Sequence, residues 1–272
     1  AASDVYKRQT QYAVIDNFLV FKFWAGEQLA YMMPVGSGDL KAILRELIED
    51  ADKEKHNFCM LGVCSNMRAD LEAILPGQFT FTENRDYADY IYLRSDLATL
   101  KGKKFQAKRN HINRFRNTYP DYEYTPITPD RIQECLDLEA EWCKVNNCDQ
   151  QEGTGNERRA LIYALHNFEA LGLTGGILHV NGKIVAFTFG MPINHETFGV
   201  HVEKADTNID GAYAMINNEF ANHIPEQYIY INREEDLGLE GLRKAKLSYQ
   251  PVTILEKYMA CLKDHPMDII RW

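Results

Sequence analysis

The stretch "GGILHVNGKIVAFTFGMPI", Gly175 to Ile193, decides the fold of this chain. Two apolar runs flank the dipeptide Asn181-Gly182 at its centre. Two-residue hairpin turns need positive φ angles, which Asn and Gly adopt at low cost. The pattern therefore predicts an antiparallel β-hairpin over Gly175–Pro192.

Strand and helix patterns alternate on both sides of this hairpin. Upstream, two helical periodicities cover Arg131–Val145 and Asn156–Leu171. Downstream, five segments are predicted in the order strand, helix, strand, helix, strand: Thr197–Ala205, Gly211–Ile224, Tyr228–Glu234, Leu239–Tyr249 and Thr253–Leu262. Twice in this order a helix begins soon after a strand ends, and such junctions are where α/β proteins hold anions and substrates.

The first part of the chain shows a similar mixture of strands and helices. Its predicted segments are strands at Tyr12–Trp24, Leu29–Val35 and Asn57–Cys64, and helices at Gly38–Lys55 (with Asp39 as N-cap) and around Met67–Leu75, followed by the aromatic run Tyr87–Leu93. Two prolines in "TPITPD", Thr125 to Asp130, then indicate a linker. The sequence thus predicts two halves, residues 1–125, which end in a basic amphipathic helix, and residues 126–272.

Composition places the chain among ordinary globular proteins, since 45% of its 272 residues are hydrophobic and 25% are charged. No apolar run reaches the roughly 18 to 20 residues needed to span a bilayer. The six cysteines form no C-x-x-C pair and no secretory segment precedes them, which predicts reduced thiols and a cytoplasmic location. The eight histidines show no ligand spacing, so no metal site is predicted.

Three stretches carry a resemblance to a known family. The hairpin with "FGVHVEKADTNIDGAYAMINNEF" and "YIYINREEDLGLEGLRKAKLSYQP" resembles the acetyltransferase-like (GNAT) fold. With "GKKFQAKRNHINRF" added, the chain from Tyr90 onward resembles the family named for the C-terminal domain of phosphatidylglycerol lysyltransferase. The resemblance implies an α/β architecture with mixed α+β sheets in tandem GNAT-like halves, and an aminoacyl-tRNA donor in characterised members.

The turn after Ala205 is the donor-binding stretch in GNAT enzymes, where backbone amides hold the pyrophosphate of coenzyme A. Here it reads "NIDGAY", with Asn208, Gly211 and Tyr213 in the places of the pattern. Asn208 is uncharged where the pattern has Arg or Gln, and Tyr213 is bulky where the pattern has Gly or Ala. The resemblance implies a donor-binding role for Asn208 and Gly211, but the departures weaken the case for coenzyme A.

A basic segment, Lys101 to Arg116, holds seven basic residues and no acidic one, although the whole chain carries 30 Lys+Arg against 39 Asp+Glu. On a helical wheel, Phe105, Ile112 and Phe115 form an apolar stripe, and cations cover most of the remaining surface. A solvated face normally mixes signs, so this face favours a polyanionic partner: a phosphate-bearing ligand or tRNA, or an anionic membrane surface. A plain solvated surface is the remaining alternative. The residues predicted to face the anion are Lys103, Lys104, Lys108, Arg109 and Arg114.

Carboxylates gather where the strand Tyr228–Glu234 leaves its sheet, in "INREEDLGLEGLRKAK". An aminoacyl group carries an ammonium, which needs carboxylates, and a developing oxyanion needs Arg or Lys. Glu203, at the end of the preceding strand, is a candidate base or amine anchor on the same reasoning. The alternative is a structural network of loop salt bridges. The candidate site residues are Glu203, Asn232, Arg233, Glu234 and Asp236, with Lys244 as a donor-binding cation.

The leading hypothesis is therefore an aminoacyl or acyl transferase that moves an activated acyl group, from aminoacyl-tRNA, to an amine or hydroxyl of a small molecule or lipid. Direct attack by the acceptor, without a covalent enzyme intermediate, is the expected mechanism. One alternative keeps the fold and uses acyl-coenzyme A to acylate a small amine. Another is a non-catalytic module that binds nucleic acid or anionic lipid.

Overall fold

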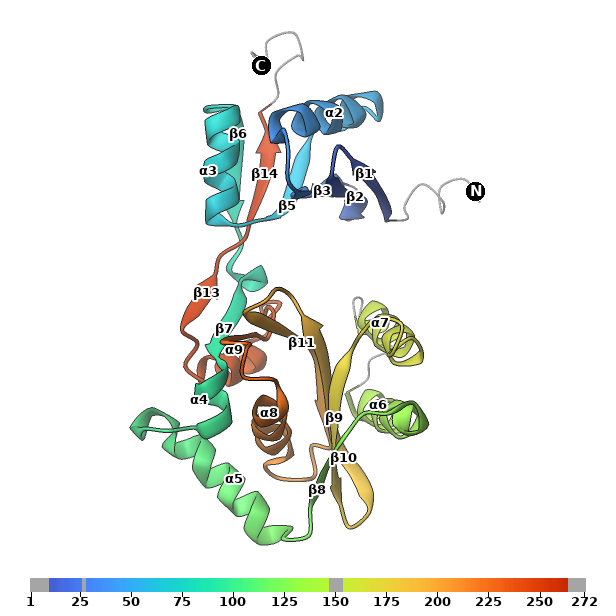
Figure 1. Ribbon diagram of the computed structural model, residues 1–272, viewed down its shortest axis with the longest axis vertical. Coiled ribbons are helices and arrows are strands. Elements are labelled where there is room, and N and C mark those ends of the chain that lie inside the picture. Colours follow the sequence, from blue (N-terminus) through green and yellow to red (C-terminus); the bar gives the residue numbers. More distant parts are fainter. Residues whose placement is uncertain (1–9, 26–27, 147–153, 264–272) are drawn as a thin grey trace. The chain divides into compact units, whose positions relative to one another are not determined.

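The structure is a computed structural model that describes residues 10–25, 28–146 and 154–263 (Figure 1). The chain forms two compact units, each built around a mixed β-sheet. The first unit comprises Ala1–Ala88 and Leu255–Trp272, and the second comprises Asp89–Ile254. The two sheets confirm the predicted α/β class with mixed sheets.

The first unit holds a seven-stranded sheet in the order β1-β2-β3-β5-β14-β6, with β4 paired to β2. Its strands and helices are β1 (Gln11–Ile15), β2 (Phe18–Ala25), β3 (Gln28–Met32), β4 (Val35–Gly36), α2 (Leu40–Lys53), β5 (Cys59–Val63), α3 (Ser65–Ile74), β6 (Phe79–Glu83), η1 (Arg85–Tyr87) and β14 (Tyr258–Leu262). The side chain of Asp39 accepts a hydrogen bond from the amide of Ala42, which confirms the predicted N-cap.

The predicted strand Tyr12–Trp24 is two strands rather than one. Asp16 and Asn17 adopt positive φ angles of 45° and 65°, and the chain turns there so that β1 pairs with β2. Asp and Asn tolerate this region better than other side chains, so the pair supplies a tight turn inside an apolar run. The prediction missed the break because the hydrophobic pattern continues across it.

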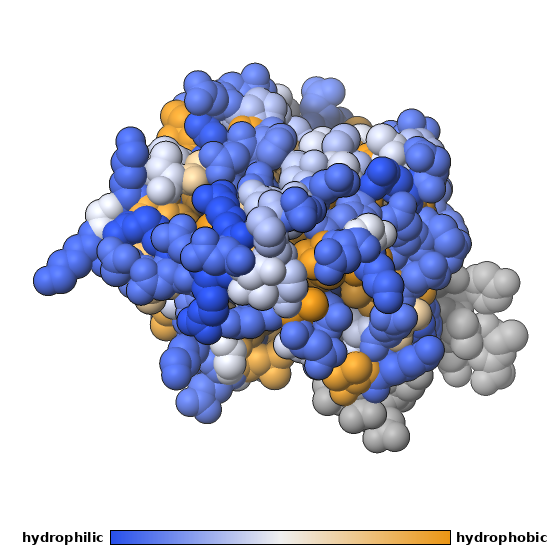
Figure 2. Space-filling model, turned by 90° about the horizontal axis from the view of Figure 1, so that it is seen from below, coloured by the Kyte–Doolittle hydropathy of each residue, from blue (hydrophilic) through white to orange (hydrophobic). Residues whose placement is uncertain are grey.

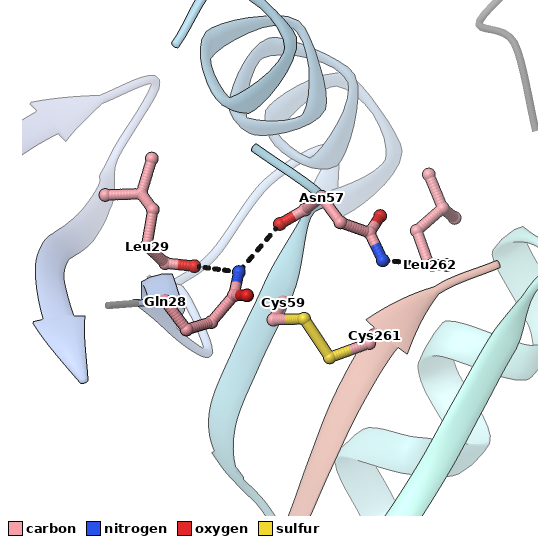
Figure 3. Close-up of a disulfide and its surroundings, with 6 residues drawn as sticks. All are labelled: Gln28, Leu29, Asn57, Cys59, Cys261 and Leu262. Atoms are coloured by element: carbon pink, nitrogen blue, oxygen red, sulfur yellow. Dashed lines mark hydrogen bonds between the residues drawn. A yellow bond between two sulfur atoms is a disulfide. The ribbon is translucent and has the colours of Figure 1, made fainter. Parts of the chain in front are cut away.

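A disulfide joins Cys59 on β5 to Cys261 on β14 (Figure 3). The two residues are 202 positions apart in the sequence but are direct partners in the antiparallel pairing, with their Cα atoms 4.1 Å apart. Asn57 donates a hydrogen bond to the carbonyl of Leu262 beside it (Figure 3). Cys143 is also disulfide-bonded. The prediction of reduced thiols is therefore wrong for these cysteines. The spacing of the cysteines in the sequence gave no sign of the pairing. Cys148 lies outside the described residues.

The second unit holds a seven-stranded sheet in the order β13-β7-β12-β11-β10-β9-β8. Its strands and helices are β7 (Asp89–Leu93), α4 (Arg94–Thr99), η2 (Lys103–Phe105), α5 (Gln106–Thr118), β8 (Glu123–Pro126), η3 (Pro129–Arg131), α6 (Ile132–Asn146), α7 (Thr154–His166), β9 (Thr174–Val180), β10 (Lys183–Pro192), β11 (Thr197–Ala205), α8 (Ala212–His223), β12 (Tyr230–Asn232), α9 (Glu240–Leu247) and β13 (Thr253–Leu255). Helices α6 and α7 cover one face of this sheet, and α8 covers the other (Figure 1).

The predicted hairpin is confirmed, since β9 and β10 pair antiparallel around Asn181 and Gly182, which have φ angles of 51° and 72°. Alternate side chains of β9 enter different cores: Ile177 packs under α6 and α7, and Leu178 packs under α8. The hairpin therefore forms the centre of the second unit.

The last predicted strand, Thr253–Leu262, is divided between β13 in one sheet and β14 in the other. The chain thus returns to its first sheet at its end, which is why the first unit is discontinuous. The predicted division after residue 125 lies within β8, inside the second unit. The two prolines do not mark a boundary between the units, because Pro126 ends β8, which belongs to the sheet of the second unit.

Among the described residues, no helix combines the length and the apolar character needed to cross a bilayer. Figure 2 shows one face of the molecule, on which hydrophilic residues predominate and hydrophobic residues form small separate groups.

Candidate active site

The site lies where β11 and β12 separate. These strands pair in parallel over Thr197–Gly199 and Tyr230–Asn232, after which β11 continues alongside β10. Glu203 on β11 and Arg233 just after β12 meet beyond the separation, with Arg233 Nη2 donating to Glu203 Oε1 at 2.9 Å. Both side chains are only 12% exposed. The strand end thus places a carboxylate and a guanidinium together in a largely desolvated position.

Asn217, on α8, completes this cluster from the helix that covers the sheet. Its Nδ2 donates to Glu203 Oε2 at 3.2 Å, and the residue is 5% exposed. Within the described part of the chain, two buried polar atoms of the cluster find no hydrogen-bond partner, Asn217 Oδ1 and Arg233 Nη1. A buried acceptor and a buried donor therefore lie on either side of the Glu203 carboxylate.

Aromatic rings surround the guanidinium. The Arg233 guanidinium carbon lies 5.1 Å from the ring centroid of Tyr249 and 5.8 Å from that of Tyr92. Lys108, from α5, places its Nζ 3.9 Å from the Tyr249 ring centroid. Burial and the positive charge of Arg233 lower the pKa of Lys108 to about 8, against a smaller opposing effect of Glu203. One cation of the basic segment thus belongs to the site.

The lowered pKa of Lys108 predicts a pH-dependent stability. Its folded-state pKa of about 8 lies below its ordinary value of 10.5, so the cost of burying the charge is fully present below pH 8 and disappears as the pH rises to 10.5. Lys108→Met removes this cost. We expect the variant to melt at a higher temperature than the wild type at pH 7, with a difference that shrinks from pH 8 to pH 10.5 in thermal melts. The control is Lys103→Met, an exposed position of the same segment, and a difference that does not vary with pH would contradict the assignment.

Glu234 and Asn232 lie at the edge of the cluster and have partners of their own. Glu234 Oε1 is 2.6 Å from Nδ1 of His201 on β11. Asn232 donates to Asp89 at 3.0 Å and accepts a hydrogen bond from the amide of Glu234 at 2.7 Å. Asn232 therefore fixes the exit of β12, where Glu234 has a φ of 57°.

Asp236, by contrast, is 0% exposed and is held within the protein. It accepts hydrogen bonds from Arg243 Nε and Nη2, each at 2.8 Å, from Tyr90 at 2.5 Å and from the amide of Gly238 at 2.9 Å. The Arg243 hydrogen bonds hold the pKa of Asp236 well below its usual range. Its contacts anchor the loop that carries Arg233 and Glu234.

Lys246, on α9, supports the same loop. Its Nζ donates to the carbonyls of Arg233 at 2.6 Å, Glu234 at 3.1 Å and Glu235 at 2.5 Å. Burial and the nearby Arg233 charge lower the pKa of Lys246 to about 8. Three carbonyls thus converge on one ammonium group, which fixes the backbone that presents Arg233.

The basic segment forms the predicted helix, with Phe105, Ile112 and Phe115 buried. Four of its seven cations, however, have acidic or carbonyl partners within the protein. Lys104 pairs with Asp96 at 2.8 Å, and Arg114 pairs with Asp210 at 2.7 Å. The partners are Asp96 (Lys104), Asp210 (Arg114), Glu219 (Arg116), and the carbonyls of Leu100 and Gly102 (Arg109). Because Lys104, Arg114 and Arg116 are paired with carboxylates, the face is less uniformly positive than the sequence suggested. Lys101 and Lys103 are exposed.

The predicted donor-binding residues lie outside the cluster. Asn208 donates to Asp206 at 2.9 Å, and Lys244 is exposed on α9. Gly211 packs so closely on α5 that an added Cβ would lie 3.2 Å from the carbonyl oxygen of His111. Within the described residues, no hydrogen bond or ion pair joins Asn208 or Lys244 to Glu203 or Arg233.

Sequence reasoning missed Asn217 and Lys246. The signal for Asn217 was available, because Asn217 and Asn218 interrupt the apolar stripe of α8 with two buried amides. Buried polar residues on a helix face need partners, and Asn218 finds them in the carbonyls of Leu97 and Ala98, each at 2.8 Å. No sequence pattern distinguishes Lys246 from the exposed Lys244.

Comparison with known proteins places this geometry in context. Residues 6–261 match the model of the family described as "Phosphatidylglycerol lysyltransferase, C-terminal". A protein of unknown function from Bacteroides thetaiotaomicron is similar at 92% identity and a TM-score of 0.92, over 96% of this chain and 88% of that one. The C-terminal domain of a putative lysylphosphatidylglycerol synthetase from Agrobacterium fabrum shares the fold at 14% identity and a TM-score of 0.73, over 94% and 84% of the two chains.

L-PGS from Bacillus licheniformis also shares the fold, at 17% identity and a TM-score of 0.66, over 96% of this chain and 86% of that one. A tandem GNAT protein from the clavulanic acid biosynthesis pathway, at 10% identity and a TM-score of 0.50 over 92% and 80% of the two chains, extends the likeness to GNAT folds. An uncharacterised protein of Mycoplasmoides gallisepticum is 26% identical over 63% of this chain. The chain matches only 55% of that curated relative's length.

Proposed function

The chain belongs to the family of phosphatidylglycerol lysyltransferase C-terminal domains, and from this premise we propose that it transfers an aminoacyl group from the ester of an aminoacyl-tRNA to an amine or hydroxyl acceptor. The observation that carries the proposal is the ion pair of Glu203 and Arg233 at the separation of β11 and β12. A carboxylate suits the α-ammonium of an aminoacyl group, and a guanidinium suits the oxygen of its ester carbonyl. A small molecule or a lipid is the acceptor.

The transfer then proceeds by direct attack. The acceptor nitrogen or oxygen forms a bond to the ester carbonyl carbon, and the negative charge that develops on the carbonyl oxygen is stabilised by Nη1 of Arg233, which has no partner among the described residues. Collapse of this intermediate breaks the bond to the ribose oxygen, and the proton lost by the acceptor passes to that oxygen. Glu203 holds the α-ammonium, so the donor is oriented before attack.

The first turn of α8 argues against the alternative donor, acyl-coenzyme A. Tyr213 occupies this turn, and its hydroxyl accepts a hydrogen bond from Trp142 Nε1 at 3.0 Å. The Trp142 ring in turn lies 3.7 Å from Nζ of Lys204. A pyrophosphate at the start of α8 would have to share this turn with the rings of Tyr213 and Trp142.

For the tRNA part of the proposal, we assign the exposed lysines at the start of the basic segment to phosphate contacts. Lys101→Glu/Lys103→Glu is expected to weaken tRNA binding several-fold at low salt. The slope of log K against log salt concentration should become less steep by the amount expected for about two phosphate contacts, because binding without these contacts releases fewer counterions. Melting temperature should change little, since exposed charges contribute little to stability. Filter binding across a salt series measures the effect.

The matched control reverses two exposed lysines elsewhere in the second unit, Lys144 and Lys183. Both double variants change the net charge by the same amount. If they weaken tRNA binding equally, the effect comes from net charge and the assignment to the basic segment fails.

Thermal shift separates the three functions, since a ligand that binds only the folded protein at 100 times its Kd adds about 2.7 kcal/mol of stability. We expect stabilisation by aminoacyl-tRNA and little by acetyl-coenzyme A. Stabilisation by acetyl-coenzyme A alone would favour the acyl-coenzyme A alternative. Equal stabilisation by charged and uncharged tRNA, or by anionic vesicles alone, would favour a non-catalytic binding module.

A further inference from the structure

The amide oxygen of Asn217, Oδ1, has no hydrogen-bond donor within reach among the described residues. Its Nδ2 donates to Glu203 Oε2 at 3.2 Å, which leaves Oδ1 as the remaining polar atom of the amide. Oδ1 is buried and has no hydrogen-bond partner in the described part of the chain. A buried amide with only a structural role would use both of its ends. An exposed amide on the same helix, such as Asn222, does not need protein partners at both ends because water reaches it. The arrangement indicates that Oδ1 accepts a hydrogen bond from a donor group of a ligand.

The complementary atom is Nη1 of Arg233, a buried donor with no partner among the described residues. Glu203 links the two groups, because its Oε1 accepts from Arg233 and its Oε2 accepts from Asn217. A ligand that fits both must present a donor to Asn217 Oδ1 and an acceptor to Arg233 Nη1. An aminoacyl ester does so with its α-ammonium and its carbonyl, which sit on adjacent carbons.

Resting on the proposed function, we propose that Asn217 and Glu203 together read the free α-ammonium group of the donor, so that the site accepts unblocked aminoacyl esters and rejects N-acylated ones. Acylation of the nitrogen removes its charge, leaves it one N–H, and adds a bulky group. The ligand would then bring no positive charge to Glu203, and the blocking group would have to fit against a buried side chain. A site built to hydrogen-bond a ligand group discriminates strongly against analogues that lack it.

Entry to the cluster requires a side chain to move, since Glu203 and Arg233 are each 12% exposed. Lys108 is suited to this, because its long stem from α5 carries its ammonium over the Tyr249 ring, which the Arg233 guanidinium also contacts. Its ammonium also lies in the field of Glu203.

The test is equilibrium binding of one tRNA pool in three forms: charged with a mixture of amino acids, charged and then N-acetylated with acetic anhydride, and uncharged. We expect the wild type to bind the unblocked charged pool at least about tenfold more tightly than either other form, on the scale of one buried hydrogen bond to a charged group. Asn217→Leu, which keeps the volume and removes the acceptor, is expected to reduce this preference to less than about threefold while binding uncharged tRNA as the wild type does.

Asn218→Leu is the matched control, because Asn218 is an equally buried amide on the same helix but donates to the carbonyls of Leu97 and Ala98. It is expected to lower stability and to keep the preference. If the wild type binds the unblocked and the acetylated pools alike, and both more tightly than uncharged tRNA, the inference on Asn217 is wrong and the tRNA donor survives. If it binds all three forms alike, the result favours a non-catalytic binding module, and the proposed donor fails together with the inference. If it binds no form of tRNA, the proposed donor fails and the inference fails with it. If Asn217→Leu does not fold, the wild-type comparison of unblocked and acetylated pools still decides.

Discussion

Arg233→Met is expected to lower the rate of aminoacyl transfer by at least about 100-fold, or roughly 2.7 kcal/mol of transition-state stabilisation, because the variant lacks the donor placed for the developing oxyanion. The same change leaves the Glu203 carboxylate buried without its 2.9 Å partner. Breaking a buried pair in this way costs about 3–5 kcal/mol of folding stability. The single variant therefore mixes a catalytic effect with a structural one.

A double variant separates the two effects. Arg233→Met/Glu203→Gln removes both charges, so it is expected to recover most of the lost stability in urea unfolding while transfer stays at the level of the single variant. The control is Arg158→Met, which breaks the 3.2 Å pair of Arg158 with the buried Glu139. That variant should lose stability and keep its rate per folded molecule. Recovery of transfer in the Arg233→Met/Glu203→Gln variant would show that the pair has only a structural role.

Asp236→Asn is expected to lower the free energy of unfolding by about 3–5 kcal/mol, since it disrupts a buried, bidentate pair with Arg243. The pH dependence has a definite sign. The folded-state pKa of Asp236 lies below its ordinary value of 3.8, so its stabilisation is present above pH 3.8 and is lost as the pH falls toward the lowered pKa. The gap between wild type and variant should therefore narrow in acid.

Urea unfolding at pH 7 and at a series of acidic pH values measures this gap. Asp210→Asn is the control, because Asp210 forms an exposed pair with Arg114 and should contribute no more than about 1 kcal/mol. An Asp236→Asn variant as stable as the wild type at pH 7, but inactive, would move Asp236 from the scaffold of the loop into the chemistry.

Local patterns in the sequence were sufficient for the hairpin and for the basic helix. Asn181-Gly182 determines a turn through its own φ angles, and the stripe of Phe105, Ile112 and Phe115 follows from helical periodicity alone. Pairings between distant segments could not be predicted in this way. Cys59 meets Cys261 only because β14 returns to the first sheet.

The candidate site shows the same distinction between local and distant information. Glu203 and Arg233 were predicted for the same site from the charges that an aminoacyl donor requires, and the structure does join them. The separate roles of Glu234 and Asp236 could not be read from a run of acids, since they depend on His201 and Arg243 as partners. The basic segment appeared unmixed because its acidic partners, Asp96 and Asp210, lie on other segments.

The most direct test of the account follows the aminoacyl group itself. The wild-type protein is incubated with tRNA carrying radioactive amino acids, or with radioactive acetyl-coenzyme A, and with a panel of small amines and phosphatidylglycerol vesicles. The account predicts that label leaves the tRNA ester and appears in an acceptor, that Arg233→Met reduces this transfer at least about 100-fold, and that acetyl-coenzyme A gives no product. Transfer of label from acetyl-coenzyme A, with none from aminoacyl-tRNA, would contradict it.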